Sequence, residues 1–303
     1  MRHGPDRHRN AVRASLAGRR GAEAGAWAGG PVVMVTGSAA TSPSVARWAA
    51  DEATLRAASL LISVTDAVDP CAEGTAFASA MTLVRAHAPA VAAHAVPART
   101  YGADPAELSA DAALVVVAAD APGTPTLAAE ADCPVVAVPD GYLTTDRSAP
   151  VLLGVAPWTA EVAIDLAFDE AELRQTALDA VRIWFDRDVD LGVPSDRGLA
   201  RFDAECDQAS RELDYALSAW SSRHPTVDVR HIVIEDSTVP ALVAFSHRSQ
   251  LLVLGRSAHG LDEARRLGSP LEPLIASTRC PVLVVPGGGP RRGRWLPGEG
   301  ITE

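Results

Sequence analysis

The segment 251–270, LLVLGRSAHGLDEARRLGSP, contains an apolar run that ends at Gly255, and a Gly-Ser pair follows thirteen residues later. A short continuous apolar run is typical of a strand that is covered on both faces of a parallel sheet. In such sheets the ligand site lies beyond the carboxyl ends of the strands. We expect Gly268 and Ser269 to begin the next helix, whose unpaired first amides favour an anion. The segment therefore has the outline of a phosphate-binding loop.

The chain contains two similar halves that differ by two changes of length. Three pairs of segments mark the repeat: DEATLR at 51–56 and DEAELR at 169–174, LVVVA at 114–118 and LLVLG at 251–255, and CPVVAVP at 133–139 and CPVLVVP at 280–286. The offsets between the copies are 118, 137 and 147 residues. The second half is therefore 19 residues longer in its middle and 10 residues longer before its Cys-Pro segment.

Each half alternates apolar strands with helices. The expected strands are 31–37, 59–64, 91–96, 114–118 and 134–138 in the first half, and 151–155, 181–185, 229–234, 251–255 and 281–285 in the second. Helices are expected from Pro43, over 75–86 and near Pro105, and in the second half from Thr159 and over 199–220. This alternation predicts right-handed crossovers and parallel sheets with helices on both faces. The fold class is therefore α/β, with two tandem doubly wound sheets of five strands.

The pattern Gly255-x2-Ala258-x9-Gly268-Ser269, followed by a strand that begins with Cys280-Pro-Val, resembles the universal stress protein signature. That signature is G-x2-G-x9-G-[ST] followed by a C-P-V strand, and the resemblance covers about 30–287 as two tandem domains. It implies the strand order 3-2-1-4-5 in each domain, as in other Rossmann-like folds of this kind. It also implies that the two fifth strands, at 135–138 and 282–285, pair to form a pseudo-dimer.

This resemblance divides the chain into four parts. Residues 31–141 are predicted to form a degenerate domain without the glycine loop, and residues 149–287 a domain with a partial nucleotide loop. Residues 1–30, which carry six Arg, are expected to be a disordered arm, and residues 288–303 a flexible tail. Whether the arm is translated in the cell is left open.

The candidate nucleotide-binding residues are Gly255, Ala258, Gly268 and Ser269. The resemblance implies that ATP-binding members hold the ribose and phosphates with this loop. Gly255, Gly268 and Ser269 match the signature. Ala258 replaces its second glycine, and a side chain there impedes a close backbone approach to phosphate.

Two further positions depart from the ATP-binding pattern. The resemblance implies an aspartate at the end of the first strand to hold adenine, but Ala156 stands there in the second half, followed by Pro157 and Trp158. Leu271 replaces a serine that usually follows the loop. Trp158 could stack on a base instead, although a core or interface position is favoured.

The basic residues of the loop leave two interpretations open. Arg256, Arg265 and Arg266 could attract phosphates, but we favour a solvated loop in which Asp262 and Glu263 balance them.

Composition excludes several classes of function. All 27 basic residues are Arg, so a Walker P-loop lysine is absent, and the net charge of −11 argues against nucleic-acid binding. No apolar run is long enough to span a membrane. The four cysteines and eight histidines show no metal-ligand spacing, and there is no G-x-S-x-G nucleophile motif. Catalytic and metal sites are therefore not predicted, and a reducing cytoplasm is the expected compartment.

Three of the cysteines are interpreted as structural. Cys133 and Cys280 would pack at the start of the fifth strands, and Cys206 would be a small core residue on the apolar stripe of the helix over 199–220.

The hypothesis that follows is a non-enzymatic stress-response module. It would act through protein partners, or through self-association by its fifth strands, with ATP binding in the second half weak or lost. The alternative is an ATP-binding sensor or switch that uses the second-half loop with ATP and magnesium.

Overall fold

The structure, a computed structural model, describes residues 27, 29–38, 41–65, 69–96, 109, 111–144, 146–184, 196–256 and 271–287, of which 196–201 are described as helical backbone alone. The first half contains β1 (Val32–Gly37), α2 (Pro43–Arg56), β2 (Leu60–Thr65), α3 (Pro70–His87), β3 (Ala93–Val96), β4 (Leu114–Ala118), α6 (Thr124–Glu130) and β5 (Val135–Val138). The second half contains β6 (Val151–Val155), α7 (Glu161–Arg174), β7 (Leu178–Trp184), α8 (Asp196–Arg223), β8 (Val229–Glu235), α9 (Thr238–Ser246), β9 (Leu251–Gly255), α11 (Leu271–Ser277) and β10 (Val282–Val285).

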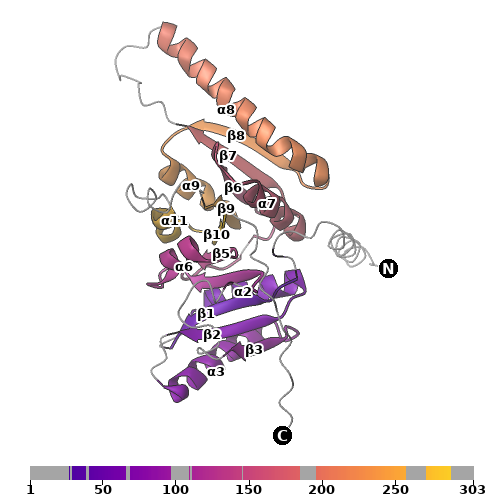
Figure 1. Cartoon of the computed structure of the whole chain (residues 1–303), viewed down its shortest axis with the longest axis vertical. Coiled ribbons are helices and arrows are strands. Elements are labelled where there is room, and N and C mark those ends of the chain that lie inside the picture. Colours follow the sequence, from indigo (N-terminus) through magenta and orange to yellow (C-terminus); the bar gives the residue numbers. More distant parts are fainter. Residues whose placement is uncertain are drawn as a thin grey trace.

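The strands form a single ten-stranded sheet (Figure 1), in the order β3-β2-β1-β4-β5-β10-β9-β6-β7-β8. Within each half the pairs are parallel and the order is 3-2-1-4-5, which confirms the predicted fold class. The two fifth strands pair antiparallel, with Leu283 opposite Val136, and so join the halves as predicted. Because β5 and β10 each have two neighbours, β3 and β8 are the outermost of the described strands.

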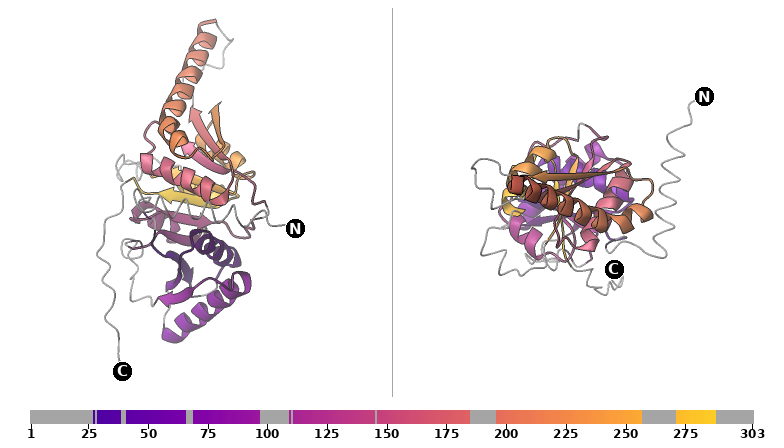
Figure 2. Two further views of the ribbon diagram at one scale, coloured as in Figure 1. Left: turned by 90° about the vertical axis from the view of Figure 1, so that its right-hand side faces the viewer. Right: turned by 90° about the horizontal axis from the view of Figure 1, so that it is seen from above.

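Helices cover both faces of the sheet. One buried cluster contains residues of α2, α3, α7 and α8, and the other contains residues of α6, α9 and α11. From Phe202 onward, where side chains are described, α8 has the predicted apolar stripe: Leu213 is fully buried and Cys206 is partly buried. The N-terminal end of α8 projects beyond β7 and β8 (Figure 2).

Several bounds differ from those predicted. β7 begins three residues before the expected strand, and the short helices α6 and α9 were not predicted. Both helices carry a proline in their first turn, Pro125 and Pro240, which reads as a loop signal in sequence. The helix expected near Pro105 lies outside the described residues.

Trp27 packs against the core although it lies within the arm that the sequence predicts to be disordered. Its indole Nε1 donates a hydrogen bond to the carbonyl oxygen of Asp132 at 3.1 Å. The described first half therefore includes a residue that precedes the predicted boundary at residue 31. In the described part of the chain, no helix is long and apolar enough to cross a membrane.

A buried network of four charges lies where α2 meets α7. Arg56 contacts Glu52 at 2.6 Å and also contacts Glu170, while Arg174 contacts Glu52 at 2.6 Å and also contacts Glu170. Glu52 and Arg56 occupy the same repeat positions as Glu170 and Arg174, 118 residues apart. Burial opposes ionisation of Glu52, but the two guanidinium charges outweigh it and keep its pKa below the usual value. The network thus marks the axis that relates the two halves.

Candidate functional site

Gly255 ends β9 and packs against α7. A Cβ added to Gly255 would lie 3.2 Å from Cβ of Ala163 and 3.6 Å from Cγ2 of Thr159. The close packing against α7 therefore explains the glycine at position 255, whether or not a phosphate approaches it. The other candidate nucleotide-binding residues, Ala258, Gly268 and Ser269, lie outside the described residues, as do Arg265 and Arg266.

The turn that follows β6, at residues 156–159, is closed by two hydrogen bonds between its first and last residues. The amide of Ala156 donates to Oγ1 of Thr159 at 2.8 Å, and the amide of Thr159 donates to the carbonyl oxygen of Ala156 at 3.0 Å. Ala156 offers no carboxylate at the place where the resemblance implies an adenine-binding aspartate. Trp158 is 59% exposed, which excludes the core position, whereas the interface position and stacking on a base stay open. An exposed indole at this position is available either to a base or to a protein partner.

Arg256, the residue after Gly255, forms hydrogen bonds with the first half. Its Nη1 donates to the carbonyl oxygens of Ala129 at 2.8 Å and Ala131 at 2.9 Å. These carbonyls lie at the C-terminal end of α6, where a positive charge is favourable. Both interpretations of Arg256, phosphate attraction and a solvated loop, are therefore replaced by a structural one.

Replacing Arg256 with alanine is expected to lower the free energy of unfolding by about 1–2 kcal/mol, because the α6 carbonyls lose a charged donor. Denaturant titration would measure the change. The control is Arg248→Ala, because the exposed Arg248 packs over the ring of Phe245 and should contribute less than about 1 kcal/mol. A loss of ATP affinity without a loss of stability would instead place Arg256 at a nucleotide.

In the first half, side-chain hydrogen bonds span the loops that follow β4 and β1. Between β4 and α6 only 119–123 intervene, whereas 256–270 separate β9 from α11, which is the ten-residue difference found in the sequence. Oγ1 of Thr124 donates to the carbonyl oxygen of Ala118 at 2.7 Å, and Oγ1 of Thr36 contacts Oγ1 of Thr41 at 3.2 Å. The absence of the glycine loop from the first half stays a prediction.

The two cysteines of the fifth strands are buried, which agrees with a structural interpretation. Cys133 is 1% exposed and Cys280 is fully buried. Burial raises the pKa of each thiol to about 12, so the reactive thiolate is disfavoured.

The sequence did not indicate a cluster of ionisable residues that α7 forms with His224, which follows α8. Nδ1 of His224 lies 3.0 Å from Oε2 of Glu172, and its Nε2 lies 3.9 Å from Oδ1 of Asp165. Burial raises the pKa of Asp169 to about 6, and the negative charge of Asp165 acts in the same direction. Burial would lower the pKa of His224, but its contacts with Asp165 and Glu172 outweigh this and raise it. The only signal in the sequence was the set of three carboxylates, Asp165, Asp169 and Glu172, at helical spacing.

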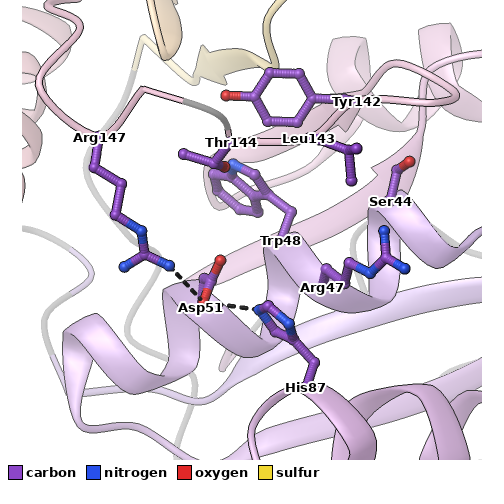
Figure 3. Close-up of a pocket in the computed structure, with 9 residues that line it drawn as sticks. All are labelled: Ser44, Arg47, Trp48, Asp51, His87, Tyr142, Leu143, Thr144 and Arg147. Atoms are coloured by element: carbon purple, nitrogen blue, oxygen red, sulfur yellow. Dashed lines mark hydrogen bonds and ion pairs between the residues drawn. The ribbon is translucent and has the colours of Figure 1, made fainter.

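A small pocket lies beside α2 in the first half (Figure 3). It is lined by Ser44, Arg47, Trp48, Asp51, His87, Tyr142, Leu143, Thr144 and Arg147. Its volume of about 110 Å³ is well below the roughly 300–1,000 Å³ of typical small-molecule sites. It is therefore a poor candidate for a nucleotide site.

Comparisons with known proteins agree with this architecture. A model of the universal stress protein family matches residues 149–286. Universal stress protein Rv2623 of Mycobacterium tuberculosis (strain ATCC 25618 / H37Rv) is 32% identical over 214 residues, covering 66% of this chain and 70% of that protein. Universal stress protein Rv2005c of the same strain is 32% identical over 192 residues, covering 59% of this chain and 63% of that protein.

Solved structures support the fold. A protein of unknown function from Pseudomonas aeruginosa PAO1, PA1789, has a TM-score of 0.56 at 15% identity, covering 86% of this chain and 94% of that chain. A universal stress protein from Archaeoglobus fulgidus DSM 4304 has a TM-score of 0.55 at 13% identity, covering 84% of this chain and 96% of that chain. These structures support the fold alone, whereas the family model and the relatives of 32% identity show that the chain belongs to the universal stress protein family.

Proposed function

We propose that the protein is a non-enzymatic stress-response module that acts through protein contacts, with ATP binding in its second half weak or lost. The observation that carries the proposal is the closed turn at 156–159. Ala156 supplies no carboxylate for adenine, and its amide already donates to Thr159. The engagement of Arg256 with the carbonyls of α6 gives further support, because it removes a nearby cation from the loop.

The sheet limits where protein contacts can form. Self-association through the fifth strands is not open to a second chain, because β5 and β10 pair with each other inside this one. Contacts would therefore use other surfaces, such as the helix α8, which projects from the rest of the molecule (Figure 1). Tyr215 of this helix is 86% exposed. The cytoplasm, predicted from the cysteine spacing, is the compartment that we propose.

The alternative, an ATP-binding switch, is favoured by two observations. Trp158, two residues after Ala156, is exposed, and its indole could stack on a base in place of the missing aspartate contact. The nine-residue spacing between Ala258 and Gly268 is also intact.

Isothermal titration of the full chain with ATP and magnesium separates the two functions. We expect binding weaker than a Kd of about 1 mM and no co-purified nucleotide, because the carboxylate and one loop glycine are missing. One tight site per chain, weakened by Gly268→Val or Ser269→Ala, would instead establish the switch. The matched control is Gly123→Val in the first half, since a Cβ at Gly123 meets no atom within 4 Å.

A gain of binding provides a second test. The double substitution Ala156→Asp, Ala258→Gly restores two residues of the ATP-binding pattern and should increase ATP affinity by at least about tenfold, a gain of about 1.4 kcal/mol. An unchanged ATP affinity would mean that these two substitutions are not what weakens ATP binding by the second half.

A further inference from the structure

Asp169, Glu172 and His224 offer three ligand atoms that all lie within 4.8 Å of one another. Asp169 and Glu172 are three residues apart on α7, so they project from the same side of the helix. His224 directly follows α8 and brings a ring nitrogen to them from a second element. We propose that these three residues bind a divalent transition-metal ion of the zinc class.

The donor set matches this ion. Zinc is bound by imidazole nitrogen and carboxylate oxygen at about 2.0–2.2 Å, which places neighbouring ligands of a tetrahedral ion about 3.4 Å apart. Side-chain shifts of about 1 Å would bring the three donors to that separation. Asp165, whose Oδ1 lies 3.9 Å from Nε2 of His224, is placed to supply a fourth ligand. Its side chain is 31% exposed, so the cluster is open to solvent on this side.

Residues around the cluster hold the donors in place. Oγ1 of Thr226 donates to Oε1 of Glu172 at 3.0 Å, while Oε2 of the same carboxylate lies 3.0 Å from Nδ1 of His224. The ring of Phe168 packs against the imidazole with 5.4 Å between centroids. The side chains of His224 and Glu172 are 8% and 6% exposed. Outer partners of this kind orient ligands in known metal sites.

The first half provides an internal comparison. Asp51 occupies the repeat position of Asp169 and lies 3.0 Å from His87, the last residue of α3 (Figure 3). Arg47, however, stands at the repeat position of Asp165, and Arg147 contacts Asp51 at 3.5 Å. Thr54 replaces Glu172. The first half therefore holds an Asp-His pair at this place, and the additional carboxylates of Asp165 and Glu172 have no counterpart there.

The position of the cluster separates it from the nucleotide loop. Glu172 lies in the last turn of α7, which leads to the start of β7, and His224 precedes the start of β8. The cluster therefore lies at the amino ends of these strands, whereas Gly255 lies at the carboxyl end of β9. A bound ion would link α7 to the end of the projecting helix α8, independently of any nucleotide.

Calorimetric titration of the full chain with zinc chloride tests the proposal. We expect one site that Asp169→Asn and His224→Gln each weaken by about tenfold or more. The matched first-half variants Asp51→Asn and His87→Gln should leave the isotherm unchanged. Zinc should also shift the imidazole resonance of His224 in a nitrogen-15 side-chain spectrum.

The comparison among variants excludes zinc bound elsewhere, for example at the exposed Cys71. If His224→Gln fails to fold, Asp169→Asn decides the result, because asparagine has the same shape as aspartate. Equal zinc isotherms for the wild type and Asp169→Asn, or no zinc binding by the wild type, would overturn the proposal.

Discussion

Replacing Glu52 with glutamine is expected to lower the free energy of unfolding by about 3–5 kcal/mol, because it leaves buried charge without a partner. The side chains of Glu52 and Glu170 are 1% and 2% exposed, and those of Arg56 and Arg174 are 15% and 7% exposed. The variant would hold two guanidinium groups against one carboxylate. Denaturant titration would measure the loss, with tryptophan fluorescence as the signal. Trp48 lies 6.0 Å from the guanidinium of Arg174 and would report on this region.

The neighbouring residue in α2 provides the control. Asp51 pairs with His87 and Arg147, but its side chain is 29% exposed and those of its partners are 33% and 70% exposed. Asp51→Asn should therefore cost less than about 1 kcal/mol. Equal small losses in both variants would contradict the assignment of a buried network.

A quadruple variant tests whether the network adds net stability. It replaces all four charged residues with leucine and methionine. Such a change is often neutral or stabilising, because the four ions no longer have to be desolvated. We expect the quadruple variant to recover most of the stability that Glu52→Gln loses. The network would then serve to specify how α2 and α7 pair, more than to add net stability.

Much of the sheet could be predicted because its signals are local and repeated. The apolar runs of β1, β4 and β9 are buried on both faces, and they alternate with helices in both halves. The strand order and the pairing of the fifth strands came from the family resemblance, since periodicity carries no information on strand order. The repeated motifs DEATLR and DEAELR were recognised, but Glu and Arg four residues apart are typical of an exposed helix surface. Only the packing of α2 against α7 buries them.

The parts that could not be predicted depend on contacts between distant residues. Arg256 reaches carbonyls more than 120 positions earlier in the chain, at the end of a helix that was not itself predicted. His224 meets Glu172 across 52 positions, because α8 ends beside α7. Neither contact leaves a short spacing in the sequence. The candidate residues Ala258, Gly268 and Ser269 stay predictions, because they lie outside the described residues.

Introducing aspartate at Leu283 is expected to abolish the folded state of the whole chain. Leu283 is 1% exposed and lies opposite Val136 at the junction of the two halves. Desolvating an unpaired carboxylate costs several kcal/mol, which is a large share of a typical stability of about 5–15 kcal/mol. Leu283→Ala should cost about 2–5 kcal/mol and leave a folded protein. Circular dichroism would measure the folded fraction.

Limited proteolysis of the same variants tests whether the halves fold as one unit. His94→Asp is the control, because His94 is exposed on the edge strand β3 and its replacement should change stability by less than about 0.5 kcal/mol. If β5 and β10 couple the halves, Leu283→Asp makes both protease-sensitive together, although the substitution lies in the second half alone. A first half that stays resistant would show that its five strands are stable without β10. The pairing of β5 with β10 would then join two separately stable domains.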